Sequence, residues 1–220
     1  MLITIDGPAG CGKSTAAREL AKALGIAHLD TGATYRAVTL LALRRGIDLA
    51  DAAALAELAR GMDIRMVSTG GRIGVVLDGQ DVTDEIRTEA VSANSRYAAT
   101  SAAVREVLVE LQRRLGRQLG SFVTEGRDQG SVVFPEADLK FYLDARPAER
   151  ARRRCEELRS HGQQADYDAV LAAIEDRDRR DRGRAVGPLR VPGGATVIDT
   201  SDMDIAQVTE RMLQYARAPR

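Results

Sequence analysis

Residues 7–14 read Gly-Pro-Ala-Gly-Cys-Gly-Lys-Ser, which matches the pattern G-x-x-x-x-G-K-S. The apolar run Leu2–Ile5 precedes this segment and is typical of a buried strand, whereas residues 14–24 have the pattern of a helix that ends at Gly25. A strand, a glycine-rich turn and a helix in this order form the context in which such a loop binds nucleotide phosphates. A chance glycine turn with an exposed lysine is the alternative, and the flanking strand and helix argue against it.

The loop predicts how a nucleotide would be held. Its glycines let backbone N–H groups turn toward phosphate oxygens, and the start of the helix adds partial positive charge. We expect Lys13 to reach the β- and γ-phosphates and the Ser14 hydroxyl to ligate Mg²⁺. The residues predicted to bind ATP with its Mg²⁺ are Gly7, Pro8, Ala9, Gly10, Cys11, Gly12, Lys13, Ser14 and Thr15.

Composition narrows the class of protein. The chain has 220 residues, 44% of them hydrophobic, and its formal net charge is zero, so no overall field attracts it to nucleic acid or membrane. No apolar stretch approaches the roughly 20 residues of a membrane span, and the first strand leaves no room for a signal peptide. We therefore expect a cytoplasmic protein. Two cysteines and two histidines provide neither a disulfide framework nor a His-rich metal site or a Ser-His-Asp triad.

Further apolar runs indicate the fold class. Each ends in a carboxylate or a glycine and alternates with helix-like stretches; they are residues 26–29, 122–124, 139–143 and 195–198. This alternation predicts an α/β fold, a parallel sheet of the P-loop NTPase type flanked by helices, which binds ligands beyond the carboxyl ends of its strands. We therefore expect the phosphate loop to share its side of the sheet with Thr31, Arg36, Glu125, Arg127 and Asp128.

One stretch interrupts the alternation. Residues 64–67, 73–77 and 80–82 are typical of short antiparallel strands, with hairpin turns at residues 68–71 and 78–79. A helix is predicted to follow from about residue 92 to residue 115. We predict a single domain over residues 1–220, with a core of about 1–60 and 100–220 and a small antiparallel insertion of about 60–100.

Residues 146–184 are rich in arginine and are predicted to be largely helical. On the second predicted helix, Arg177, Asp181 and Arg184 follow at i, i+4 and i+7 and so share one face. A solvated face held by weak surface ion pairs is one interpretation. Beside a phosphate-binding loop we favour a helical, arginine-rich lid, at about residues 152–168, that closes over a transferring group.

The chemistry compatible with these residues is phosphoryl transfer. Positioning and charge neutralisation provide nearly all of its catalysis, so no general base is nominated. Five segments then carry a resemblance to a known family: residues 7–14, 29–36, 81–88, 125–135 and 177–184. In this order, from residue 3 to about residue 216, the chain resembles bacterial cytidylate kinases, whose longer members enlarge the nucleoside-monophosphate-binding region at this insertion. The resemblance implies a monomer of pyrimidine metabolism that transfers the γ-phosphate of ATP to CMP or dCMP.

The resemblance also implies roles for individual residues. Arg36, Arg127 and Arg184 resemble the arginines that hold the acceptor phosphate. Arg154 resembles a lid arginine that faces the transferring phosphate. The residues expected to act in catalysis are Lys13, Arg127, Arg154 and Arg184.

The remaining roles concern the acceptor nucleoside. Arg105 and Asp128 resemble a pair that recognises cytosine, and Arg177 with Asp181 resembles the pair at the ribose. Thr31 stands where relatives often have serine, and its hydroxyl keeps the same hydrogen-bonding capacity. A carboxylate can accept from the cytosine amino group while an arginine donates to the ring acceptors, and uracil would be rejected.

Several alternatives stay open. Asp128 has a second possible role as an acid associated with Mg²⁺, as does Glu125, and Arg96 replaces a serine that relatives usually have near the base. The phosphate loop contacts only ATP, so it does not separate CMP from UMP, AMP or an alcohol as acceptor. A non-catalytic, nucleotide-dependent binding module, with the insertion as its docking surface, is the alternative from a different class, and the arginine-rich lid argues against it.

Overall fold

The computed structural model describes residues 1–69, 72–160 and 162–218, and the chain divides into two compact units. The first unit comprises residues 1–26 and 121–220, and the second comprises residues 27–120. The insertion predicted at about 60–100 thus falls inside the second unit, which also contains the helices on either side of it in the sequence.

Among the described residues of the first unit, four parallel strands form a sheet in the order β6-β1-β7-β8. They are β1 (Leu2–Asp6), β6 (Phe122–Gly126), β7 (Leu139–Asp144) and β8 (Thr196–Asp199). Because β1 lies between β6 and β7, its Ile3 and Ile5 are completely buried, which accounts for the apolar run that opens the chain. The predicted α/β fold with a parallel sheet is confirmed.

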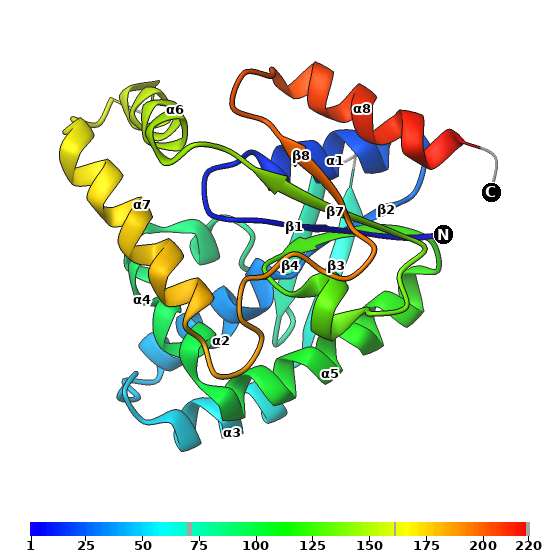
Figure 1. Ribbon diagram of the computed structural model, residues 1–220. Coiled ribbons are helices and arrows are strands. Elements are labelled where there is room, and N and C mark those ends of the chain that lie inside the picture. The colour runs from blue at the N-terminus through cyan, green and yellow to red at the C-terminus, as the bar shows by residue number, and fades with distance from the viewer. Residues whose placement is uncertain (70–71, 161, 219–220) are drawn as a thin grey trace. The chain divides into compact units, whose positions relative to one another are not determined.

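Helices cover this sheet and supply the rest of its core. They are α1 (Lys13–Leu24), α6 (Pro147–Ser160), α7 (Tyr167–Arg182) and α8 (Ile205–Arg217). Helix α1 packs against α8, and α6 packs against α7 (Figure 1). Leu20 of α1 and Met212 of α8 are fully buried in the same apolar cluster as Ile3 and Ile5. As predicted, α1 ends at Gly25, which adopts the left-handed conformation of a helix C-cap.

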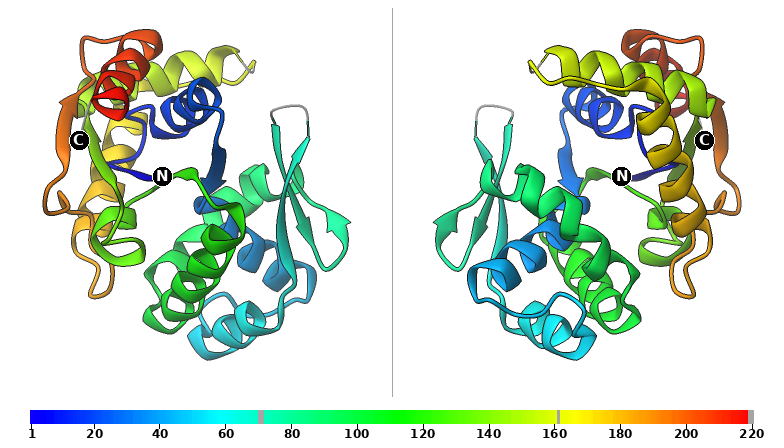
Figure 2. Two further views of the ribbon diagram at one scale, coloured as in Figure 1. Left: turned by 90° about the vertical axis from the view of Figure 1, so that its right-hand side faces the viewer. Right: turned by 90° about the vertical axis from the view of Figure 1, so that its left-hand side faces the viewer.

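The second unit combines helices with a small antiparallel sheet. Within the described residues, the unit contains the strand β2 (Ala27–Asp30), which is not part of this sheet. The antiparallel sheet consists of β3 (Ile64–Thr69), β4 (Arg72–Leu77) and β5 (Gln80–Asp81), in the order β3-β4-β5. Figure 2 shows these three strands as a twisted ribbon. The predicted turn at Asp78 and Gly79 is present, with φ of 49° and 81°, whereas Gly70 and Gly71 of the other predicted turn lie outside the described residues.

The helices of the second unit correct one prediction. They are α2 (Gly32–Arg44), α3 (Ala52–Gly61), a short 3₁₀ turn at Glu85–Arg87, α4 (Glu89–Thr100) and α5 (Ala102–Leu119). The prediction of a single helix over residues 92–115 is wrong, because the helix is interrupted at Ser101. The backbone of Ser101 is extended, and its side chain accepts a hydrogen bond from the Val104 N–H. A serine at this position caps a new helix instead of continuing the old one. None of the helices in the described ranges is long and apolar enough to cross a membrane.

Gly7 is the point at which the phosphate loop leaves β1. Its φ is 148°, a value that L-residues rarely adopt, and a Cβ atom built on it would lie 2.0 Å from the backbone oxygen of Leu143 in β7. The loop therefore leaves the sheet in contact with the backbone of the neighbouring strand. No side chain fits between them without displacing one of the two segments.

We predict that Gly7→Ala lowers the free energy of unfolding by about 3 kcal/mol or more, since backbone strain and a clash with a buried strand add together. Gly25→Ala is the matched control, because Gly25 also has a positive φ (66°) but nothing lies within 4 Å of a Cβ there. Its cost should be about 1–2 kcal/mol. Urea titrations of both variants test the difference, and equal losses would show that the approach to Leu143 is not restrictive.

Candidate functional site

The phosphate loop, residues 7–12, connects β1 to α1. Gly10 and Gly12 have φ of 79° and 88°, and Gly12 caps α1. Lys13, the first residue of α1, is only 5% exposed, and its Nζ donates a hydrogen bond to the backbone oxygen of Pro8 at 2.5 Å. Burial lowers the pKa of Lys13, and the nearby Arg127 lowers it further. The ammonium group is therefore held against the loop's own backbone.

Ser14 contacts a carboxylate of the neighbouring strand. Its Oγ donates to Oε1 of Glu125 at 2.7 Å. Glu125 belongs to β6 and pairs in register with Ile5 of β1, so strand pairing brings it to the phosphate loop. A hydroxyl and a carboxylate are hard oxygen ligands of the kind that Mg²⁺ prefers.

Arginines of the first unit gather around Asp181. Arg127, which follows β6, donates from Nε to Oδ2 of Asp181 at 2.7 Å, and Arg184, which follows α7, donates from Nη2 to Oδ1. Arg177 lies one turn before Asp181 on α7, and burial lowers its pKa to about 10, with Arg127 adding to the shift. The structure thus brings together four of the five residues of this unit for which the sequence predicted acceptor-binding roles, the fifth being Asp128.

The charges in this cluster do not balance. Burial acts to raise the pKa of Asp181, and Arg127 and Arg184 more than offset it, so the pKa is lowered and the carboxylate is ionised. Arg177 also interacts electrostatically with Asp181; when Lys13 and Glu125, which both interact with Arg127, are included, four cations lie near two carboxylates, an excess of two positive charges. Lys13 is electrostatically coupled to Arg127 and Arg177, so this excess lies beside the phosphate loop.

Asp6, at the end of β1, was not among the predicted site residues. It is completely buried, and its two carboxylate oxygens accept from the backbone N–H groups of Gln129 and Gly130, both at 2.8 Å. These two residues begin a short π-helix, Gln129–Val133, and the residue immediately before it is Asp128, which is buried. Asp6 therefore anchors the turn that carries Asp128. The sequence does not predict this link, because a single acidic residue at a strand end does not show which backbone groups it binds.

Arg150 is a second residue that the sequence did not single out for the site. It is 1% exposed and lies on α6. Its guanidinium donates to the backbone oxygens of Ala145 (2.9 Å) and Ala9 (3.0 Å) and to Oδ2 of Asp178 (2.7 Å). Because Ala9 belongs to the phosphate loop and Asp178 to α7, this one side chain connects the loop to both helices.

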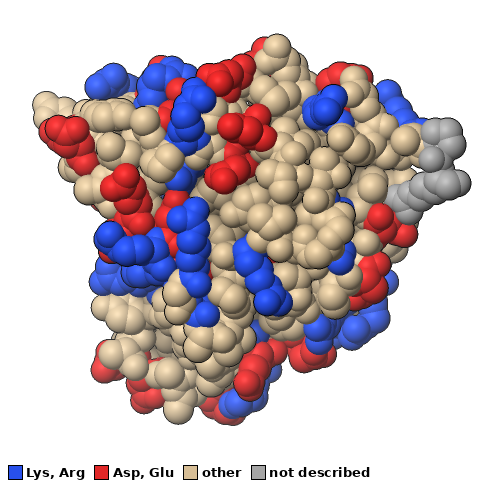
Figure 3. All heavy atoms as spheres, in the orientation of Figure 1, with Lys and Arg blue, Asp and Glu red and all other residues tan. Residues whose placement is uncertain are grey.

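Other arginines of the same stretch form a solvated face. Basic and acidic side chains alternate over the region of α6 and α7 (Figure 3). Arg154, predicted to face the transferring phosphate, is half exposed and pairs with Glu157 one turn further along α6 at 2.7 Å. Arg154 is thus not brought into the Asp181 cluster. The predicted lid, about residues 152–168, spans the end of α6 and the start of α7, and His161 within it lies outside the described residues.

The second unit places its predicted residues around Asp30 at the end of β2. The Asp30 carboxylate accepts from Arg36 at 2.8 Å, from Arg87 at 3.2 Å and from the backbone N–H of Ala33 at 3.1 Å. Thr31, the next residue, is buried at the start of α2. Arg87 lies in one of the segments that carry the family resemblance, but the sequence analysis did not name it as a site residue. In the structure it shares the Asp30 carboxylate with Arg36, which identifies it as a candidate.

Arg105, also in the second unit, is almost fully buried on α5. Its guanidinium lies over the ring of Tyr35, 5.5 Å from the ring centre, and donates to the backbone oxygen of Ala99 at 3.3 Å. The aromatic face and the carbonyl hold the planar group in one orientation. Arg96, by contrast, lies on α4 over the ring of Tyr97.

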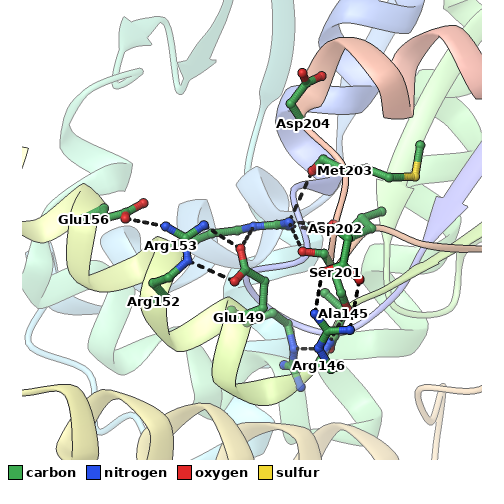
Figure 4. A network of polar contacts seen from close by, with 12 residues as sticks. Ala145, Arg146, Glu149, Arg152, Arg153, Glu156, Ser201, Asp202, Met203 and Asp204 are labelled. Atoms are coloured by element: carbon green, nitrogen blue, oxygen red, sulfur yellow. Dashed lines mark hydrogen bonds and ion pairs between the residues drawn. The ribbon is translucent and has the colours of Figure 1, made fainter.

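A cavity of about 590 Å³ lies beside the phosphate loop in the first unit. It is lined by Gly12, which caps α1, and Thr15 of α1, by residues 200–204 of the loop between β8 and α8 with Ile205 at the start of α8, and by Arg153 of α6. Figure 4 shows this loop with Arg153 of α6 and with Arg146, which precedes α6, both reaching it. Because it borders the end of the phosphate loop, it is suitable for the nucleoside part of a nucleotide whose phosphates occupy the loop.

Comparisons with known proteins identify the family of this chain. The family model for cytidylate kinase matches residues 3–218. The chain is 46% identical over 216 residues to the cytidylate kinase of Shigella boydii serotype 4 (strain Sb227) and 45% identical over 216 residues to that of Klebsiella pneumoniae (strain 342). Each alignment covers 98% of this chain and 95% of the relative.

Similar solved structures bear on the fold alone. One is a shikimate kinase from Bacteroides thetaiotaomicron, with a TM-score of 0.53 at 13% identity over 99% of each chain. Another is TT1252 from Thermus thermophilus, with a TM-score of 0.51 at 19% identity over 98% of this chain and 95% of that one. Both support the architecture of a parallel sheet flanked by helices.

The buried Asp6 predicts an unusual dependence of stability on pH. Burial raises its pKa from 3.8 to about 6, although the two backbone N–H groups favour the charged form. The folded protein therefore binds this proton more tightly than the unfolded chain, so the free energy of unfolding falls as pH rises from about 4 to about 6, by up to about 3 kcal/mol. Carboxylates with lowered pKa values, such as Glu149 at about 2, act in the opposite sense and at lower pH.

Asp6→Asn removes the titrating group while keeping the shape of the side chain. We expect the fall in stability between about pH 4 and pH 6 to disappear in this variant. Chemical unfolding at a series of pH values measures it, and the difference between wild type and variant isolates Asp6 from the other carboxylates. If the two proteins change in parallel across this range, Asp6 does not carry the raised pKa.

Proposed function

Because the chain belongs to the cytidylate kinase family, we propose that it transfers the γ-phosphate of ATP to CMP or dCMP and releases ADP with CDP or dCDP. The observation that carries this proposal is the excess of positive charge around the buried Asp181, beside a phosphate-binding loop. Such an excess suits the charge that accumulates where two nucleotides exchange a phosphoryl group. A protein that only binds a nucleotide has no need of several arginines around a second phosphate.

On the donor side, residues 7–15 would hold ATP. Backbone N–H groups of the loop surround the phosphates, and Lys13 exchanges its contact with Pro8 for phosphate oxygens. The adjacent oxygens of Ser14 and Glu125 fit Mg²⁺, which takes few protein ligands and completes its shell with phosphate and water. When bound, Mg²⁺ neutralises charge on the β- and γ-phosphates. The cavity beside Gly12 and Thr15 would take the nucleoside of ATP.

On the acceptor side, arginine forks would bind the phosphate. Arg127 and Arg184 of the first unit and Arg36 of the second are each oriented by a carboxylate, which leaves other N–H groups of each guanidinium to donate. Arg154 would approach the transferring phosphoryl group from the lid. Thr31 would add a hydroxyl at the start of α2.

For the nucleoside of the acceptor, we assign Arg177 and Asp181 to the sugar and Arg105 and Asp128 to the base. Cytosine has an amino group that can donate a hydrogen bond to a carboxylate, and next to it ring acceptors to which an arginine can donate. The rigid placement of Arg105 over Tyr35 supports a role in recognition, since a fixed donor discriminates better than a mobile one.

The transfer itself needs little from side-chain proton chemistry. An oxygen of the acceptor phosphate, already anionic, forms the new bond to the γ-phosphorus as the bond to the bridging β–γ oxygen breaks and ADP leaves. Lys13, Arg127 and Arg184 stabilise the negative charge that spreads over the transferring group. No general base is required.

A panel of acceptors tests the proposal. ADP release from ATP and Mg²⁺ should depend on CMP or dCMP, with UMP and AMP far less effective and little hydrolysis without an acceptor. Lys13→Met is the control for contaminating kinases, and its kcat should fall by orders of magnitude. Faster turnover with another acceptor, or hydrolysis that ignores the acceptor, would overturn the assignment.

Asp128→Asn tests base recognition. A carboxamide can present either a donor or an acceptor, so we expect kcat/KM to fall about tenfold or more for CMP and the preference over UMP to narrow. The KM for ATP serves as the internal control and should stay near its wild-type value. An unchanged ratio of CMP to UMP, together with a raised Mg²⁺ requirement, would instead support the alternative role beside the metal.

A further inference from the structure

Arg153, on α6, is bonded to the backbone of the loop between β8 and α8. Its Nη2 lies 2.5 Å from the backbone oxygen of Thr200 and 3.3 Å from those of both Ser201 and Met203 (Figure 4). Carbonyls of three residues in a single short loop therefore face one guanidinium group. Since a cation is the common partner of these oxygens, it fixes the course of the loop between them.

A carboxylate on the same helix orients Arg153. Its Nε donates to Oε1 of Glu149 at 3.0 Å, and Glu149 also accepts from Arg152. These arginines keep Glu149 ionised, because the Arg152 hydrogen bond lowers its pKa to about 2. The guanidinium of Arg153 is thus bonded to Glu149 through Nε and to the loop through Nη2, while the side chain is still 27% exposed.

The loop that Arg153 holds also contacts the phosphate loop. The hydroxyl of Thr200 lies 3.3 Å from the backbone oxygen of Cys11 and 3.0 Å from that of Asp144. Nη1 of Arg153 is 3.4 Å from the same hydroxyl. The contacts thus run from α6 through Thr200 to the phosphate loop, and the cavity beside Gly12 and Thr15 lies along them.

We propose that Arg153 is a positioning residue for the donor nucleoside: by fixing the backbone carbonyls of residues 200–203, it maintains the wall of the cavity in which the nucleoside of ATP binds. This inference rests on the proposed function. Arg153 contacts the wall and not the phosphates, so it should contribute to nucleoside binding and not to the transfer step. Water can replace it as a partner of the carbonyls but does not fix their positions, so the loss should appear in binding more than in stability.

Arg153→Met removes the donors and keeps the aliphatic stem. We expect the KM for ATP to rise roughly tenfold, the size of one lost charge-assisted hydrogen bond. The kcat at saturating ATP and the KM for CMP should stay within about twofold of wild type, the pattern of lost ground-state binding. Arg153→Lys, which retains a cation near the carbonyls, should recover part of the loss.

Arg146→Met is the matched control. Arg146 also reaches the same loop, but through an ion pair with the Asp202 side chain in which both partners are more than half exposed. Its backbone N–H bond to the Ser201 hydroxyl survives the substitution. The KM for ATP should therefore change by less than about twofold, as expected for a surface ion pair.

Direct binding separates this inference from a general structural defect. Calorimetry with ATP and with inorganic tripolyphosphate, both with Mg²⁺, should show that Arg153→Met weakens ATP about tenfold and leaves tripolyphosphate unchanged, since only ATP has a nucleoside. Equal weakening of both ligands, or of neither, overturns the proposal. If Arg153→Met does not fold, Glu149→Gln, which removes the charge that orients Arg153, should give a smaller shift in the same direction, and no shift there overturns it too.

The two proposals fail in different ways. Absence of CMP-dependent turnover in the wild-type protein would refute the proposed function while the comparison of ATP with tripolyphosphate still tests Arg153. Normal turnover in the wild type with unaltered ATP binding in Arg153→Met would refute the role of Arg153 alone.

Discussion

Repulsion among closely placed cations, Lys13 and the arginines around Asp181, is the constraint around which the first unit is arranged. Arg127 and Arg177 both lower the pKa of Lys13, and Arg127 and Arg184 both lower that of Arg177. Cations placed this close repel one another, and the carboxylates of Asp181 and Glu125 offset part of that repulsion. The remaining excess favours any ligand that brings negative charge. The electrostatic cost to the folded protein and the proposed affinity for phosphate therefore have the same origin.

Helix α7 resolves this constraint with two carboxylates that are three residues apart. Asp178 holds Arg150, whose guanidinium also binds the phosphate loop at Ala9, and Asp181 holds Arg127 from the end of β6. Residues at i and i+3 lie on the same side of a helix, so one rigid element fixes groups from distant parts of the sequence. A small displacement of α7 would move Arg150 and Arg127 together. The helix thus positions the charges as a set.

How far the sequence predicts this arrangement depends on the range of the interactions. The phosphate loop was predictable because its strand, glycines and helix are consecutive. The break at Ser101 was missed, since apolar spacing continues through it and only the cap reveals it. A different reason explains why Asp6, Arg150 and Arg153 were missed. Whether a charged residue is buried depends on the phase of its helix or the pairing of its strand. Two arginines of α6 that are separated by one residue differ in burial: Arg150 is buried, whereas Arg152 is exposed.

In both units a carboxylate is shared by two arginines. The number of N–H donors that each arginine uses explains why these ion pairs leave the arginines able to bind a ligand. Asp30 receives one N–H from Arg36 and one from Arg87, and Asp181 likewise receives one from Arg127 and one from Arg184. A guanidinium has five N–H donors, so each arginine gives up a minority of them. One carboxylate shared by two arginines also leaves a net positive charge. Each pair therefore fixes the direction of a guanidinium in advance while preserving both its charge and most of its donors, which lowers the entropic cost of binding a phosphate.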